Sequence, residues 1–166
     1  IRNVKAKKRI AVDISDHVLP LQKSGVIAIQ STATTFAARL PELADVIMMS
    51  NFLEHLTHKN LVMQVLEECR RALKPGGRVL ILQPNIRYLG AAYWDYIDHH
   101  IALTDVCLTE ALEVTGYEVE KVIPRFLPYT AKSRLGGFAN LSSLYLKVPL
   151  LWRIFGKQSF IVGRAK

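Results

Sequence analysis

Short apolar runs alternate with segments of helical pattern along most of the chain. Four of the runs are rich in β-branched residues and end at polar or turn residues, which is typical of buried strands: 9–15 (RIAVDIS), 26–30 (VIAIQ), 44–50 (ADVIMMS) and 78–83 (RVLILQ). Because both faces of these strands are apolar, we expect a parallel sheet that is covered by helices on each side.

The helical pattern is clearest between the third and fourth runs. Over residues 60–73, apolar side chains recur at helical spacing, with glutamates and arginines on the opposite face. Pro75 cannot continue this helix, and Gly76 or Gly77 is expected to supply the left-handed residue that ends it. Repeats of strand, helix and strand indicate right-handed parallel crossovers, and therefore an α/β fold.

Weaker patterns extend this arrangement to both ends of the chain. Residues 16–24 are expected to form a short helix that ends at a glycine. Thr104 is a predicted N-cap for a helix over 104–116, and an alternating strand follows at 117–126. Residues 159–165 are predicted to form the last strand.

An insertion at 127–157 separates the last two predicted strands. It is rich in proline, glycine, serine and basic residues, and helices are expected at 141–148 and 149–156. Large apolar side chains alternate there with Lys147, Arg153 and Lys157. This pattern fits a lid that lies on an anionic membrane surface or on a lipid-linked substrate, and it fits a plain substrate-covering lid equally well.

Length and composition favour one folded domain over 1–166. Half of the 166 residues are apolar, no run of 18 apolar residues is present, and the first residues lack a secretory signal pattern. Cys69 and Cys107 match no metal or redox spacing and indicate reduced thiols. We therefore expect a cytoplasmic protein, with contact to the inner membrane face as an option through 127–157.

Positive charge is concentrated in the last part of the chain. The net charge is +8, and residues 121–166 contribute +9 because they hold nine lysines and arginines and no acidic residue. This asymmetry suggests an anionic partner, although a basic surface that only aids solubility explains it equally well. Because no nucleic-acid motif accompanies the charge, we do not expect a nucleic-acid partner.

Polar residues collect where the predicted strands end, which is where ligands bind in open α/β sheets. These positions are Asp13, Ser31–Ala33, Ser50–His55 and Pro84–Asn85. An acidic residue at the end of a strand in a nucleotide fold commonly accepts hydrogen bonds from ribose hydroxyls. The alternative for such a residue is an ordinary turn or helix cap.

In sequence order, the segments AVDIS, ADVIMMSNFLEHL, LEECRRALKPGGRVLILQPN and LTEALEVTGYEVEKV resemble the later motifs of class I S-adenosylmethionine-dependent methyltransferases (methyltransferase type 11-like). The most diagnostic segment, RRALKPGGRVLILQPN, is similar to that family's R-x-L-K-P-G-G corner, and SNFLEHL is similar to the motif after its fourth strand. The resemblance covers about residues 9–123 and the last strand. It implies a Rossmann-like sheet, mostly parallel with an antiparallel last strand, and S-adenosylmethionine as cofactor.

The same resemblance implies roles for residues on the adenosine side. Asp13 is expected to hold the ribose hydroxyls, and Ile14 to pack on the adenine face. Thr32 and Ala33 are expected to face the adenine edge. The family often has an aspartate at the Thr32 position, and a threonine hydroxyl is a weaker acceptor for the adenine amine.

Further along, Ser50, Asn51 and Phe52 are expected to line the methionine side of the cofactor. His55 is expected near the substrate mouth. The alternative for His55 and His58 is a pair of histidines at a helix start, and no metal site is predicted.

A methyl acceptor that bears a hydroxyl benefits from a base, because methyl transfer depends otherwise on positioning and desolvation. The candidates for the base are His99 and His100, together with Asp98, and Tyr93 or Tyr96 is expected to shape the site. The alternative is a loop in which Asp98 caps and a histidine packs.

One part of the family pattern is missing. Its first strand and glycine-rich loop have no counterpart here, since no glycine precedes Gly25. In the family that strand lies between the strands that end at Asp13 and Ser50, so its absence leaves a gap of roughly 9–10 Å. Four explanations stay open: a fragment, omitted upstream residues, a strand from another chain such as a homodimer partner, or direct pairing of the two flanking strands. We favour truncation.

Two functions from different classes follow. The first is methyl transfer from S-adenosylmethionine to a small-molecule, saccharide or lipid-linked acceptor, since QPNIRY, YWDYIDHH and PRFLPYTAKSRL weakly resemble methyltransferases of surface-polysaccharide and lipid-linked sugar pathways. The second is a truncated or degenerate methyltransferase-like domain that dimerises or binds a partner without catalysis.

Overall fold

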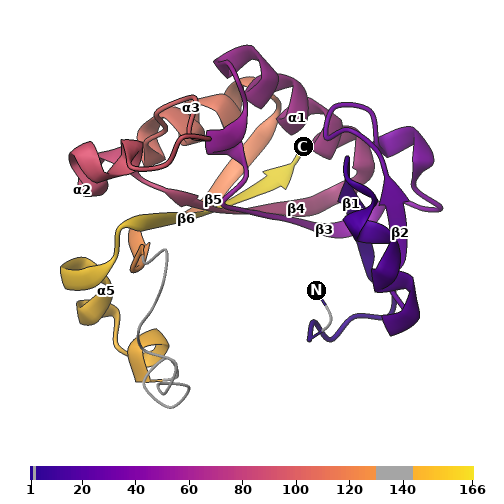
Figure 1. Ribbon diagram of the computed structural model, residues 1–166, viewed down its shortest axis with the longest axis horizontal. Helices are drawn as coiled ribbons and strands as arrows, with labels where there is room; N and C mark the ends of the chain where they lie inside the picture. Colours follow the sequence, from indigo (N-terminus) through magenta and orange to yellow (C-terminus); the bar gives the residue numbers. More distant parts are fainter. Residues whose placement is uncertain (2, 130–143) are drawn as a thin grey trace.

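Six strands in two unequal sheets form the centre of the molecule, which we describe from a computed structural model for residues 1, 3–129 and 144–166 (Figure 1). The strands are β1 (Ile10–Asp13), β2 (Ile27–Gln30), β3 (Ala44–Ser50), β4 (Leu73–Pro84), β5 (Tyr117–Leu127) and β6 (Gln158–Ala165). The α-helices are α1 (Lys59–Ala72), α2 (Ile86–Leu89), α3 (Asp105–Val114) and α5 (Pro149–Phe155), and residues 144–147 are also helical. Short 3-10 helices lie at Asp16–Ser24, Ala37–Arg39, Leu53–His55 and Gly90–Trp94.

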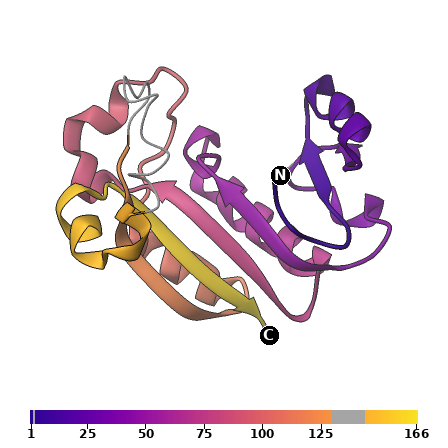
Figure 2. The ribbon, with the colours of Figure 1, turned by 90° about the horizontal axis from the view of Figure 1, so that it is seen from below.

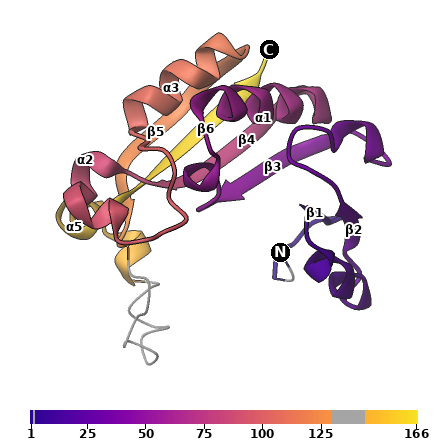
Figure 3. The same ribbon diagram turned by 45° about the horizontal axis from the view of Figure 1, so that its top comes forward.

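The larger sheet has the strand order β3-β4-β6-β5. β3 and β4 are parallel, whereas β6 runs antiparallel to both of its neighbours. Helices α1 and α3 lie side by side on one face of this sheet (Figures 1 and 3). The core forms between these two helices and the sheet. Its fully buried residues include Leu66, Ile81, Leu112, Tyr117 and Ile161. The expected α/β fold with an antiparallel last strand is confirmed.

The smaller sheet consists of β1 and β2, which pair in parallel and stand beside the β3 end of the larger sheet (Figure 3). Among the described residues, β1 pairs with β2 alone and β3 with β4 alone. Direct pairing of the strands that end at Asp13 and Ser50, one of the four explanations above, is therefore wrong. Each sheet instead presents an open edge.

The LKPGG corner differs from its expected geometry. Helix α1 already ends at Ala72, because Leu73 is extended with φ −89° and ψ 146°. Gly76, with φ +74°, comes later, in a bulge where the register with β3 passes from Leu73 to Arg78 across two residues of the partner strand. A Cβ atom on Gly77 would lie 2.9 Å from the Lys74 carbonyl oxygen. The glycines therefore shape the entry to β4, and the prediction that one of them ends the helix is wrong.

Helices cover only one face of β3 among the described residues, although the apolar strands predicted helices on both. Figure 2 shows the larger sheet from the side opposite α1 and α3. On this side Val46 and Met48 are 52% and 58% exposed. Because both faces of this strand are apolar, the sequence predicted that both would be buried. Among the described residues, helices bury one face only.

Two predicted caps are present. Thr104 accepts a hydrogen bond from the Cys107 backbone N–H at the start of α3, and Gly25 ends the Asp16–Ser24 helix with φ +69°. No helix among the described residues has the length and hydropathy needed to cross a membrane.

Candidate functional site

Asp13 and Ile14 lie at the end of β1, open to solvent. Asp13 accepts a hydrogen bond at Oδ1 from the Ser15 backbone N–H at 2.8 Å, and Ile14 is 70% exposed. Gln30, at the end of β2, donates its side-chain N–H to the Ile14 carbonyl oxygen at 3.2 Å. An exposed carboxylate and an exposed apolar side chain are thus neighbours on this strand end.

Thr32 and Ala33 follow β2 in the next turn. The Thr32 hydroxyl lies 2.7 Å from the Thr35 hydroxyl and 3.2 Å from that of Thr34. Ala33 packs against the main core and is half-buried. Because the Asp13 carbonyl oxygen accepts from the Ser31 N–H at 2.9 Å, the ends of β1 and β2 form one continuous surface.

Ser50, Asn51 and Phe52 lie at the end of β3, on the other sheet. Asn51 has a left-handed backbone, with φ +48°, and its N–H donates to the Leu82 carbonyl oxygen of β4 at 2.9 Å. Phe52 is half-buried against the core, whereas Ser50 is exposed. The two groups of predicted cofactor residues therefore sit on separate sheets, without a shared strand pair to join them.

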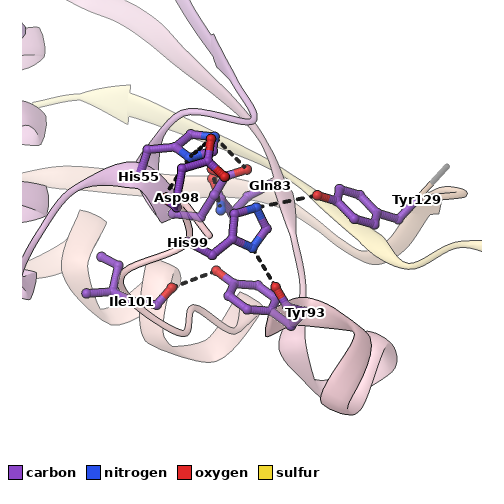
Figure 4. Close-up of polar contacts among 8 residues, drawn as sticks. His55, Gln83, Tyr93, Asp98, His99, Ile101 and Tyr129 are labelled. Carbon is purple, nitrogen blue, oxygen red and sulfur yellow. Dashed lines mark hydrogen bonds and ion pairs between the residues drawn. The ribbon is translucent and has the colours of Figure 1, made fainter. Parts of the chain in front are cut away.

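His55 belongs to a different cluster, at the carboxyl end of the larger sheet (Figure 4). Its Nδ1 lies 3.0 Å from the Asp98 carbonyl oxygen and 3.3 Å from the Asp98 carboxylate. The His55 and His99 rings meet edge to face, with centroids 5.3 Å apart. The structure thus brings together two predicted residues that are 44 positions apart in the sequence.

His99 is the buried member of the DHH segment. Its Nδ1 lies 2.6 Å from the Tyr93 carbonyl oxygen, and its Nε2 lies 3.4 Å from the Tyr129 hydroxyl. A carbonyl oxygen only accepts, so His99 donates from Nδ1, and the lone pair of the neutral ring is at Nε2. Burial raises the pKa of Tyr129 to about 12, so its hydroxyl keeps its proton at neutral pH.

His100 points elsewhere. Its side chain is exposed, and its backbone N–H donates to the Glu54 carbonyl oxygen at 2.9 Å. The structure therefore separates the two histidines that the sequence offered as equivalent bases.

Glu54 and Gln83 complete the cluster. Glu54 lies in the predicted segment Ser50–His55 but was given no role, and Gln83 was not predicted. Glu54 is fully buried, and its Oε2 accepts from the Gln83 side-chain N–H at 2.9 Å. Within the described part of the chain, its Oε1 has no hydrogen-bond partner. The only sequence signals were an acidic residue beside a histidine in SNFLEHL and a polar residue at the end of an apolar strand.

Asn85, by contrast, has a structural role at the end of β4. It is fully buried, caps α2 through the Arg87 N–H, and donates to the Asp105 carboxylate at 2.8 Å. These bonds join the sheet to the start of α3.

Comparison with known proteins places this geometry in a family. The model of a methyltransferase domain matches residues 2–81 of the chain. A search of curated proteins found no match. Residues 2–81 thus match a methyltransferase domain, and the chain has the fold of S-adenosylmethionine-dependent methyltransferases. This agrees with the fold and the cofactor that the resemblance implied.

Solved methyltransferases share the fold of this chain over nearly its whole length. A SAM-dependent methyltransferase from Archaeoglobus fulgidus is 22% identical, with a TM-score of 0.66 over 93% of this chain and 75% of that one. One from Thermotoga maritima is 19% identical, with a TM-score of 0.67 over 95% and 73%. The N-methyltransferase NodS from Bradyrhizobium japonicum, in complex with S-adenosyl-L-homocysteine, is 12% identical, with a TM-score of 0.62 over 96% and 67%.

Proposed function

We propose that this methyltransferase methylates a hydroxyl oxygen of a small-molecule, saccharide or lipid-linked acceptor. The observation that carries the proposal is His99, a buried histidine whose Nε2 lone pair faces a phenol at the carboxyl end of the sheet. A hydroxyl acceptor needs a proton acceptor at its reacting oxygen, whereas a deprotonated amine does not.

The adenosine half of the cofactor fits the end of β1 and β2. Asp13 has a carboxylate in solvent whose Oδ1 is held by the Ser15 N–H, so Oδ2 is directed to accept from ribose hydroxyls. Ile14 offers an exposed apolar surface for the adenine ring, and the hydroxyl of Thr32 lies in the next turn. Ala33 would border the adenine edge.

The methionine half would lie toward Ser50, Asn51 and Phe52. The exposed Ser50 hydroxyl and the left-handed Asn51 backbone border the end of β3, next to the cluster of His55. When bound, the cofactor supplies a sulfonium methyl group for in-line displacement. The protein's contribution is to hold the acceptor oxygen in line and away from water.

His99 is assigned to the acceptor and His100 is not. As the acceptor oxygen takes the methyl group, its proton passes to His99 Nε2, while Nδ1 stays bonded to the Tyr93 carbonyl oxygen. Tyr96 lies against His99 with ring centroids 5.1 Å apart and borders the place of the acceptor.

The saccharide or lipid-linked nature of the acceptor is supported by the aromatic rings and by α5. Tyr96 and Tyr129 pack edge to face, and sugar rings favour such aromatic surfaces. In α5, Leu150 and Ile154 are 61% and 56% exposed and alternate with basic Arg153. This mixture suits contact with an anionic lipid headgroup or membrane surface. The predicted lid of 127–157 lies partly outside the described residues.

Two measurements test the proposal. Calorimetric titration with S-adenosylhomocysteine should show binding that weakens in Asp13→Ala. Transfer of a labelled methyl group to a panel of hydroxyl and amine acceptors should favour hydroxyls, and His99→Gln should lower kcat by about 10²-fold or more. His100→Gln is the matched control and should keep wild-type kcat.

Equal losses in the two histidine variants would contradict the role of His99. Absence of binding to S-adenosylhomocysteine would contradict catalysis and favour the partner-binding alternative.

A further inference from the structure

Three acceptor atoms converge at the buried end of the cluster. A Glu54 carboxylate oxygen and one ring nitrogen each from His55 and His99 lie within 4.8 Å of one another. They come from two separate segments, since Glu54 and His55 end one 3-10 helix and His99 follows a turn more than 40 positions later. Tertiary folding therefore creates this group.

The second ring nitrogen of each histidine is already occupied. His55 Nδ1 and His99 Nδ1 lie 3.0 and 2.6 Å from backbone carbonyl oxygens, to which they must donate. In the neutral rings this places both lone pairs at Nε2. Histidines that bind metals in proteins show the same pattern, with the other N–H donated to a carbonyl or carboxylate.

Glu54 adds a buried carboxyl group that is only partly satisfied. Its side chain is 1% exposed, and Oε1 has no hydrogen-bond partner among the residues that the structure describes, although Oε2 accepts from Gln83. His55 Nε2 lies 3.8 Å from Oε1, which is too far for a hydrogen bond. A buried carboxylate oxygen is costly unless a cation or a donor reaches it.

We propose that Glu54, His55 and His99 bind a divalent first-row transition-metal ion such as Zn²⁺. Two imidazoles and one carboxylate form a ligand set that zinc and other such metals use, and a fourth position stays open for water or a substrate oxygen. Nitrogen ligands disfavour Mg²⁺ and Ca²⁺. Metal–ligand bonds of about 2.0–2.1 Å require the three ligand atoms to move together until they are roughly 3.3 Å apart. The His55 side chain, 35% exposed, has room for that movement.

Gln83, Asp98 and Tyr93 form the outer contacts of this site. Gln83 orients the carboxylate, while the carbonyl oxygens of the other two fix the imidazoles. The carboxylate of Asp98, 3.3 Å from His55 Nδ1, adds negative charge on the open side.

The metal site does not depend on the identity of the methyl acceptor. A bound metal ion would occupy the lone pair of His99 Nε2. In the proposed function the same lone pair accepts the proton of the methyl acceptor. Bound Zn²⁺ is therefore expected to lower methyl transfer, and chelation to restore it.

The test measures metal binding without cofactor or acceptor. Equilibrium dialysis of the chain with Zn²⁺ should give one ion per chain, and Co²⁺ in its place should give the intense visible absorption of a four-coordinate site. Glu54→Gln keeps the shape of the side chain and the Gln83 contact, and should weaken binding by more than about tenfold. His55→Gln should do the same, while His17→Ala, at a fully exposed histidine, and His100→Ala should bind as wild type.

Thermal unfolding of each variant without metal shows whether the fold is kept. A wild-type chain that binds no ion, or binding unchanged in the Glu54→Gln, His55→Gln double variant, would overturn the site. If Zn²⁺ binds and raises methyl transfer, the metal site stands and the proton-accepting role of His99 fails.

Discussion

The two sheets of this methyltransferase fold differ in how they are stabilised. The larger sheet packs on α1 and α3, and its core contains nearly all of the fully buried apolar side chains. The smaller sheet and its 3-10 helix bury Val18 and Val26. Toward the main core, β1 contributes the half-buried Val12, and the segment after β2 contributes the half-buried Ala33 and the buried Phe36.

Because of this difference, the residues proposed to bind the cofactor adenosine lie on the less stable of the two sheets. A two-stranded sheet is marginally stable by itself, so β1 and β2 depend on contacts beyond their own pairing. Asp13 and Ile14 stand on this weaker unit, whereas the cluster of Glu54, His55 and His99 stands on the stable one. The proposed acceptor side is therefore preorganised, and the proposed adenosine side is expected to open more easily.

The largest expected effect comes from matched isoleucines in the two sheets. Ile81→Ala in β4 removes a fully buried side chain and should lower the free energy of unfolding by about 2–5 kcal/mol. Ile29→Ala in β2 removes a half-buried one and should cost about 1 kcal/mol or less. Urea unfolding of both variants checks the difference, and equal costs would show that the smaller sheet belongs to the main cooperative core.

Much of this fold could be predicted because the signals are local. Apolar runs bounded by polar residues indicated β1 to β4, an alternating pattern indicated β5, a last strand was predicted at the position of β6, and helical spacing indicated α1. The corner at Leu73–Gly77 was predicted wrongly because the bulge depends on pairing with β3. There, Lys74 forms an ion pair with Asp45 at 2.7 Å, a contact that no local pattern encodes.

The site was less predictable because its parts meet only in the folded chain. His99 and His100 are neighbours in sequence, and the turn that carries them decides which one is buried. Glu54 sits in a segment that reads as polar, and the loop that returns at His100 and Ile101 buries it through two bonds to its carbonyl oxygen. The cofactor roles of Asp13, Ile14, Thr32, Ala33, Ser50, Asn51, Phe52 and His55 stay predictions.

An intermediate effect is expected from Tyr117, which belongs to the larger sheet. Its hydroxyl donates to the Leu66 carbonyl oxygen at 2.8 Å, and burial raises its pKa well above the usual value. Tyr117→Phe should cost about 1–2 kcal/mol near neutral pH, because a buried carbonyl loses its extra donor. Urea unfolding at pH 7 measures this cost.

The same tyrosine gives a pH dependence with a definite sign. A raised pKa in the folded state gives stability that is present below pH 10 and lost as pH rises, since only the unfolded chain ionises readily there. Above pH 10 the wild type should therefore lose stability more steeply than Tyr117→Phe. Parallel slopes would contradict the shift. The smaller sheet holds no tyrosine, since the first is Tyr88, so its amide exchange should show no such step.

The smallest expected effect compares helix caps in the two units. Thr104 accepts from the Cys107 N–H at the start of α3, and Ser15 accepts from the His17 N–H at an exposed 3-10 helix. Thr104→Ala should lower the free energy of unfolding by about 1 kcal/mol, because the lost cap frays a helix that covers the core. Ser15→Ala should cost only a few tenths of this amount, because its helix contributes little to the cooperative unit. The Ser15 backbone N–H that holds Asp13 is unaffected by this change, so affinity for S-adenosylhomocysteine should stay as in wild type. A loss of affinity with unchanged stability would instead show that the cap orders the adenosine side.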